Sequence, residues 1–204
     1  RGTAYRCSGC TTLDPTWLEG IVVYRNASVR FTVSELSQAA SICYNQASMR
    51  QSQALAVMLS GKSVFLTGAP GAGKTYVLNE FIRRAKQLGK QVAVTASTGI
   101  AATHIGGTTI HSWSGLGIRD QLNDYDKQWL KGNDRLRKRY NAADVLVIDE
   151  ISMLHGARLD MVNEACKILR ENDQAFGGLQ VILVGDLFQL PPVNRASETT
   201  RNVR

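Results

Sequence analysis

A glycine-rich stretch, Gly68-Ala69-Pro70-Gly71-Ala72-Gly73-Lys74-Thr75, has the residue types and spacing that bind phosphate groups. It fits the pattern G-x-x-x-x-G-K-[ST] in full, after a short apolar run and before a helical pattern. Its glycines let the backbone curl so that N–H groups point at phosphate oxygens. Lys74 supplies a charge for the β- and γ-phosphates, and Thr75 offers a hydroxyl to Mg²⁺. We therefore predict a site for ATP and Mg²⁺ that uses Gly68, Gly71, Ala72, Gly73, Lys74, Thr75 and Tyr76.

An acidic pair, Asp149-Glu150, directly follows the apolar run Val145 to Ile148. Carboxylates in such a place are costly unless they face a metal ion or solvent. They also stand at the carboxyl end of a predicted strand, where ligands of α/β proteins bind. We expect Asp149 to hold Mg²⁺ and Glu150 to be the general base that activates the attacking water. Gln189, just past a later strand, is expected to sense the γ-phosphate, although a plain loop is the alternative.

The elements that position these residues follow from hydrophobic periodicity. Continuous apolar runs predict short buried strands, and apolar residues at helical spacing predict helices between them. The predicted strands are 64–67, 92–94, 145–148 and 181–184, and the predicted helices are 49–59, 74–88 and 158–170. This alternation indicates an α/β fold with a parallel sheet covered by helices on both faces.

Residues 1–45 differ from the remainder and are predicted to be an appendage of unknown role, with the ATP-binding domain at 46–204. Residues 1–45 contain β-like runs at 21–24 and 29–33 but no chemical motif. Cys7 and Cys10 have the spacing of half a zinc site. No second close pair follows, so ordinary thiols in a reducing compartment are the alternative reading.

The 204 residues carry 24 Lys and Arg against 17 Asp and Glu. This balance suits a polyanionic partner such as nucleic acid, and it also suits an ordinary basic protein. No apolar run approaches the roughly 18 residues that would span a bilayer, so no membrane partner is expected. The basic run Arg135 to Arg139 is interpreted as a solvated helix face.

Two hydroxyl- and glycine-rich segments, Thr95 to Ala102 and Gly106 to Trp113, indicate which partner the ATP-binding domain acts on. Small polar groups of this kind can approach a phosphodiester backbone closely without reading bases. We expect both segments to be loops. On composition alone, however, an ordinary Thr- and Gly-rich loop is equally compatible.

In order along the chain, the segments 68–75, 95–102, 106–113, 147–154 and 185–193 resemble motifs I, Ia, Ib, II and III of Pif1-type superfamily 1B helicases. Helix 158–170, leading into 176–180, is similar to that family's signature element. The resemblance implies a RecA-like P-loop domain of a motor that moves 5′ to 3′ on single-stranded or forked DNA. It implies that Gln53 is the Q-motif residue that holds adenine. It also implies that the strand is contacted by Thr98, Gly99, Thr108, His111 and Ser112.

Family members continue into a second RecA-like domain, and nothing after Val193 resembles its motifs. We therefore expect the chain alone to bind Mg-ATP, to hydrolyse it slowly and to unwind nothing, with a C-terminal helicase half in the full-length protein. The resemblance further implies a monomer that acts in DNA repair, recombination and telomere maintenance. It favours the bacterial cytoplasm over the nucleus or mitochondrion. Two alternatives remain: an AAA+-like ATPase, and a nucleotide-dependent DNA-binding module without motor activity.

Overall fold

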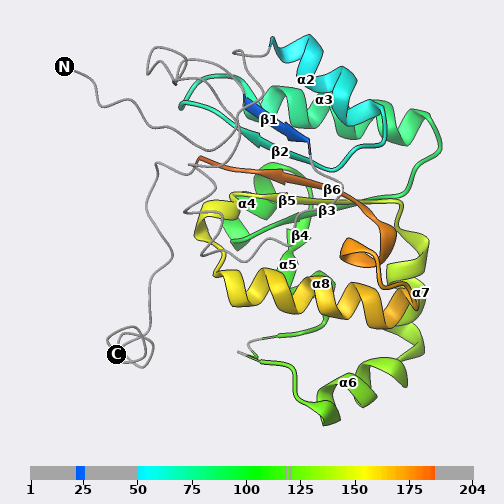
Figure 1. Ribbon diagram of the computed structural model, residues 1–204. Coiled ribbons are helices and arrows are strands. Elements are labelled where there is room, and N and C mark those ends of the chain that lie inside the picture. Colours follow the sequence, from blue (N-terminus) through cyan, green and yellow to red (C-terminus); the bar gives the residue numbers. More distant parts are fainter. Residues whose placement is uncertain (1–21, 26–49, 118, 120, 187–204) are drawn as a thin grey trace, which may run out of the picture.

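A computed structural model describes residues 22–25, 50–117, 119 and 121–186, and shows one sheet between two layers of helices (Figure 1). The six strands are β1 (Val22–Arg25), β2 (Val64–Thr67), β3 (Val92–Ala96), β4 (Thr108–Thr109), β5 (Val145–Asp149) and β6 (Gln180–Val184). Their order is β1-β2-β6-β5-β3-β4. Strands β2 to β6 run parallel, and β1 pairs antiparallel with β2. All four predicted strands are confirmed, and β1 and β4 extend the sheet at its two edges. The predicted β-like run 21–24 overlaps β1, and the run 29–33 lies outside the described residues.

The central strand β5 explains why an unbroken apolar run in the sequence predicts a buried strand. All five of its residues are buried. Val145 and Val147 belong to the core on one face of the sheet, and Leu146 and Ile148 belong to the core on the other. Successive side chains of a strand point to opposite faces, so a strand covered on both sides must be apolar throughout.

Three helices pack on one face: α2 (Gln51–Leu59), α3 (Lys74–Gln87) and α4 (Gly99–His104). The other face is covered by α5 (Ile110–Ser114), α6 (Asp124–Lys131), α7 (Asp134–Ala142) and α8 (Gly156–Arg170). Figure 1 shows α2 and α3 on one side of the sheet and α6 to α8 on the other. Two 3-10 turns, η2 (Ile151–Met153) and η3 (Ala175–Gly178), flank α8 in sequence.

The three predicted helices are confirmed in α2, α3 and α8, each with ends within two residues of the prediction where the residues are described. The basic run 135–139 lies on α7, as expected of a helix face. The expectation of two plain loops was wrong, because they contain α4, β4 and α5. Helix α6 was not predicted. Among the described residues, no helix is both long and apolar enough to cross a bilayer.

Candidate active site

The glycine-rich turn lies between the end of β2 and the first turn of α3. Gly73 precedes the helix with φ 84°, a left-handed conformation that favours glycine. The ammonium of Lys74 donates to the carbonyl oxygens of Gly68 (2.6 Å) and Ala69 (3.1 Å), which close the turn around it. Thr75 and Tyr76 are exposed on the first turn of α3. The sequence-predicted phosphate residues are therefore together, with a cation held inside their turn.

A glutamine that the sequence analysis did not select lies against this turn. The side-chain amide of Gln51 donates to the carbonyl of Ala72 at 3.2 Å. A Cβ built on Gly73 would stand 2.3 Å from Gln51 Nε2, so a larger residue at this position would displace the Gln51 side chain from the turn. Gln53, the predicted adenine contact, accepts from the backbone N–H of Arg50 (3.0 Å) and so caps its own helix. The helical phase of α2 decides which glutamine meets the turn, and spacing in the sequence did not reveal that phase.

The acidic pair Asp149-Glu150 lies at the carboxyl end of β5, at the same edge of the sheet as the glycine-rich turn. Asp149 is only 8% exposed, and its carboxylate accepts from the backbone N–H of Glu150 at 2.9 Å. Burial raises the pKa of Asp149 above its ordinary value, and the neighbouring charge of Lys74 partly opposes this shift. Glu150 is partly exposed and has φ 53°, a conformation uncommon outside glycine. The pair is therefore a buried carboxylate close to the Lys74 charge, followed by a more accessible one.

Neighbouring strand ends meet around Asp149. The backbone N–H of Ser97, just past β3, donates to the Asp149 carbonyl at 3.0 Å. On the other side, Gly185 follows β6 and donates to the Leu66 carbonyl at 3.2 Å. Asp186 comes next and is 4% exposed, so a second buried carboxylate lies at this edge. Its signal in the sequence resembles that of Asp149: an acid close behind an apolar strand, here with Gly185 between the strand and the acid. Gln189 lies outside the described residues.

The side chains at this edge fit a magnesium nucleotide by their chemistry. Mg²⁺ prefers oxygen ligands and usually takes one or two from the protein, with the remainder from phosphates and water. The hydroxyl of Thr75 and the carboxylate of Asp149 are such ligands. Two buried hydroxyls, Ser97 Oγ just past β3 and Ser152 Oγ in η2, have no hydrogen-bond partner within the described part of the chain. In that same part, no group of three or more His, Cys, Asp and Glu side chains forms a metal site; Cys7 and Cys10 lie outside it.

The predicted DNA contacts surround the two short helices that follow β3 and β4. Thr98 caps α4, because its hydroxyl accepts from the backbone N–H of Ala101 at 3.2 Å. Thr109 caps α5 in the same way, accepting from Ser112 at 3.2 Å. Beyond these caps, Gly99, Thr108 and Ser112 are exposed. Ile100, which was not predicted, is an exposed apolar side chain at 77%.

His111 is the titratable side chain of this group. It is partly buried on α5, and burial lowers its pKa, with a smaller contribution from the charge of Arg158. Arg158 comes from α8 and donates to the carbonyl of Gly117 at 2.9 Å. Burial therefore favours the neutral imidazole, which has one hydrogen-bond donor and one acceptor and adds no positive charge.

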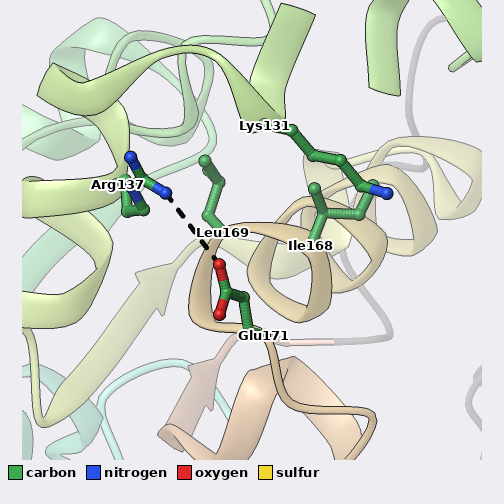
Figure 2. A pocket seen from close by; sticks show the side chains of 5 residues that line it. All are labelled: Lys131, Arg137, Ile168, Leu169 and Glu171. Atoms are coloured by element: carbon green, nitrogen blue, oxygen red, sulfur yellow. Dashed lines mark ion pairs between the residues drawn. The ribbon is translucent and has the colours of Figure 1, made fainter. Parts of the chain in front are cut away.

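A cavity of about 300 Å³ lies elsewhere, beside α6, α7 and α8 (Figure 2). Its lining residues are Lys131, Arg137, Ile168, Leu169 and Glu171. None of them belongs to the glycine-rich turn or the acidic pair, and Arg137 and Glu171 form a loose ion pair at 3.9 Å. This cavity therefore takes no part in the site described above.

Comparison with known proteins agrees with this geometry. Residues 41–204 match the family model of the PIF1-like helicases. The chain is 52% identical over 154 residues to an ATP-dependent DNA helicase Pif1 of Psychrobacter sp. (strain PRwf-1), covering 76% of this chain and 23% of that relative. It therefore spans about a quarter of the length of that curated relative.

Two solved structures share the fold. The Pif1 helicase of Candida albicans matches with a TM-score of 0.67 and 41% identity, covering 76% of this chain and 35% of that one. A Bacteroides Pif1 helicase in complex with ADP-AlF₃ and single-stranded DNA matches with a TM-score of 0.59 and 40% identity, covering 67% and 31%. The parallel sheet and its helices thus form a RecA-like domain, and the chain belongs to the PIF1-like helicase family.

Proposed function

We propose that this chain is the ATP-binding motor domain of a 5′-to-3′ DNA helicase, which binds Mg-ATP at the glycine-rich turn and single-stranded DNA along α4 and α5. The observation that carries the proposal is the position of Lys74. Its ammonium lies inside the turn, on the carbonyls of Gly68 and Ala69, and its charge acts on the buried Asp149. A cation in a glycine turn beside a buried carboxylate suits a phosphate chain with its metal ion.

In this proposal each side chain has a separate task. Lys74 exchanges its two carbonyl partners for phosphate oxygens, and the backbone N–H groups of 71–75 bind the same oxygens. Thr75 and Asp149 hold Mg²⁺, which when bound stabilises negative charge on the phosphates. Glu150 accepts a proton from the attacking water, because it is the more accessible of the two carboxylates. Gln51 contacts the nucleotide, since it is the glutamine that touches the turn.

The strand-binding part rests on the exposed residues of α4 and α5. Gly99, Thr108 and Ser112 leave backbone and hydroxyl groups open to solvent, and His111 adds a neutral donor. Ile100 offers an apolar surface to a base or sugar. Thr98 supports α4 through its cap. The Bacteroides relative that shares this fold was solved with single-stranded DNA.

Hydrolysis by this chain alone should be slow. The chain spans 23% of its Psychrobacter relative, and we propose that the remaining part of such a protein supplies cationic groups for the transferred phosphate. Loss of an arginine finger lowers rates by about 10³ to 10⁵ in phosphoryl-transfer enzymes. Binding of Mg-ATP does not require that finger, so binding and turnover are expected to separate.

The test measures nucleotide binding and ATP turnover with and without single-stranded DNA. Saturable Mg-dependent binding, with turnover raised by DNA, is expected of a helicase motor. Turnover that ignores DNA would instead indicate an AAA+-like ATPase, and DNA affinity that responds to ATP without sustained turnover would indicate a binding module. Lys74→Ala should remove nucleotide binding. His111→Ala should weaken DNA binding and leave nucleotide binding unchanged.

A further inference from the structure

Helix α5 is too short to be stable by its own hydrogen bonds. It has five residues, Ile110–Ser114, and ends at Gly115 with φ 72°. Isolated helices shorter than about 12 residues are marginal in water. Its N-terminus is capped by Thr109. A helix also leaves its last carbonyl groups unsatisfied, and these need partners from outside. The orientation of His111 and Ser112 therefore depends on what binds the C-terminal carbonyls of α5.

Two adjacent residues of α7 bind those carbonyls. Nη1 of Arg139 donates to the carbonyl oxygens of Ser112 (3.2 Å) and Trp113 (2.7 Å). The hydroxyl of Tyr140 donates to the carbonyl of Ser114 at 3.0 Å. Three consecutive carbonyls are thus satisfied from one neighbouring helix. A guanidinium at a helix C-terminus is also favoured by the helix dipole.

Packing reinforces these hydrogen bonds. The rings of Trp113 and Tyr140 lie 4.5 Å apart between centroids, and both side chains are buried. A Cβ on Gly115 would stand 2.7 Å from Leu136 Cδ2, so α7 approaches the end of α5 as closely as glycine permits. Leu136, Arg139 and Tyr140 are spaced i, i+3 and i+4 and therefore share one face of α7. This face holds α5 in place.

We propose that Arg139 is a positioning residue for DNA binding: it fixes α5 so that His111 and Ser112 meet the strand, and does not contact DNA through this nitrogen. The proposal rests on the proposed function, in which α5 binds single-stranded DNA. Tyr140 is fully buried and belongs to the core, whereas Arg139 is partly exposed. Arg139 Nη1 donates to two α5 carbonyls, so loss of this side chain loosens α5 without opening the core.

The experiment compares Arg139→Ala with Lys138→Ala in the whole chain. Both changes remove one positive charge from α7, and Lys138 is exposed. Affinity for a fluorescent oligothymidylate is measured over a series of salt concentrations, together with affinity for Mg-ATP. Loss of two hydrogen bonds to α5 should weaken DNA binding about five- to tenfold in Arg139→Ala. Lys138→Ala should change it less than about twofold. Affinity for Mg-ATP should stay unchanged in both variants.

The salt dependence separates positioning from direct contact. A phosphate contact by Arg139 would lower the slope of log affinity against log salt by about one in Arg139→Ala, and that result overturns the proposal. An unchanged slope supports it. Partial recovery in Arg139→Lys, which keeps one donor group, also supports it. In a His111→Ala background the effect of Arg139→Ala should shrink, because both changes act through α5.

Amide hydrogen exchange tests the structural step without DNA. The amides of α5 should exchange faster in Arg139→Ala than in Lys138→Ala, while those of β5 stay protected in both. Unchanged exchange in α5 overturns the proposal even if DNA affinity falls. Absence of oligothymidylate binding by the unaltered chain would defeat the proposed function itself, and the exchange measurement would still decide whether Arg139 holds α5.

Discussion

Asp149 combines a functional position with an unfavourable environment. Burial raises its pKa, which means that the folded chain disfavours the ionised carboxylate. The stabilising contribution of such a group is present below its ordinary pKa of 3.8 and is lost as pH rises through the raised value. At neutral pH the charge therefore opposes folding, and in the proposed function it serves to hold Mg²⁺. Residues that bind ligands often carry such a stability cost.

Replacing Asp149 by Asn should raise thermal stability at pH 7 and remove Mg-dependent nucleotide binding. The amide can still accept from the Glu150 N–H but carries no charge to desolvate. A gain of 1 kcal/mol would raise Tm by roughly 2–4 °C in a chain of this size. Scanning calorimetry at pH 7 and below pH 4 checks this, because the gain should vanish where Asp149 is protonated. A lower Tm in Asp149→Asn at pH 7 would contradict the argument.

Gln51 and Gln53 offer a matched pair on one helix turn. Gln51 donates to Ala72 in the glycine-rich turn, whereas Gln53 accepts from Arg50. We expect Gln51→Ala to weaken Mg-ATP binding by about fivefold, the effect of one lost hydrogen bond of about 1 kcal/mol. Gln53→Ala should leave that affinity unchanged and remove only a helix cap. Isothermal titration of both variants decides between them. A larger loss of affinity in Gln53→Ala would restore Gln53 as the nucleotide contact.

At the scale of elements, the sequence predicted those strands and helices that show a regular hydrophobic pattern. Strands β2, β3, β5 and β6 and helices α2, α3 and α8 are each long enough, or apolar enough, to show a pattern. Helices α4 and α5 are too short to show such a pattern, since they have six and five residues. Caps and tertiary contacts stabilise them. The sequence predicted Thr98 as a DNA contact and Thr109 as part of a loop, because hydroxyl- and glycine-rich composition does not distinguish a helix cap from an exposed loop residue.

Helix α8 shows how one charged side chain can join several elements. Arg170 donates to the carbonyls of Tyr140 (2.6 Å) and Ala143 (3.1 Å) at the end of α7, and to Gly177 (2.8 Å) in η3. Among the described residues, the ion pairs of Arg137 on α7 are exposed ones, with Asp134 and Glu171. Nothing in the spacing of the basic residues distinguishes the two arginines, because the difference depends on which carbonyls the fold leaves unsatisfied.

Arg170→Ala should therefore lower the free energy of unfolding by roughly 2–3 kcal/mol, because three carbonyls lose a charged donor. Arg137→Ala should change it by less than about 1 kcal/mol, as expected of surface ion pairs. Urea denaturation followed by circular dichroism measures both variants under the same conditions. Equal losses of stability in the two variants would refute the distinction between them.

At the scale of the whole molecule, the strand order brings distant motifs to one edge. Strand β6 lies between β2 and β5, and β3 lies beyond β5. The turn at 68–75, the acidic pair at 149–150 and the residues after β3 and β6 therefore meet, although more than a hundred residues separate the first from the last. The sequence predicted this meeting from motif order and strand type. It did not predict Gln51, whose contact with the turn depends on the helical phase of α2, and Asp186 was not selected although it follows an apolar strand.

In our proposal the chain supplies Lys74, Thr75, Asp149 and Glu150, while further cations come from the remainder of a full-length protein. ATP binding should then be similar in this chain and in a version extended to the length of its Psychrobacter relative, of which it now spans 23%. The turnover rate with single-stranded DNA should rise by about 10³-fold or more on extension. Steady-state kinetics with matched nucleotide titrations measures both quantities. If extension tightened ATP binding but left the maximal rate unchanged, the added part would contribute to ATP binding and not to turnover. The proposal that it supplies cations for the transferred phosphate would then be wrong.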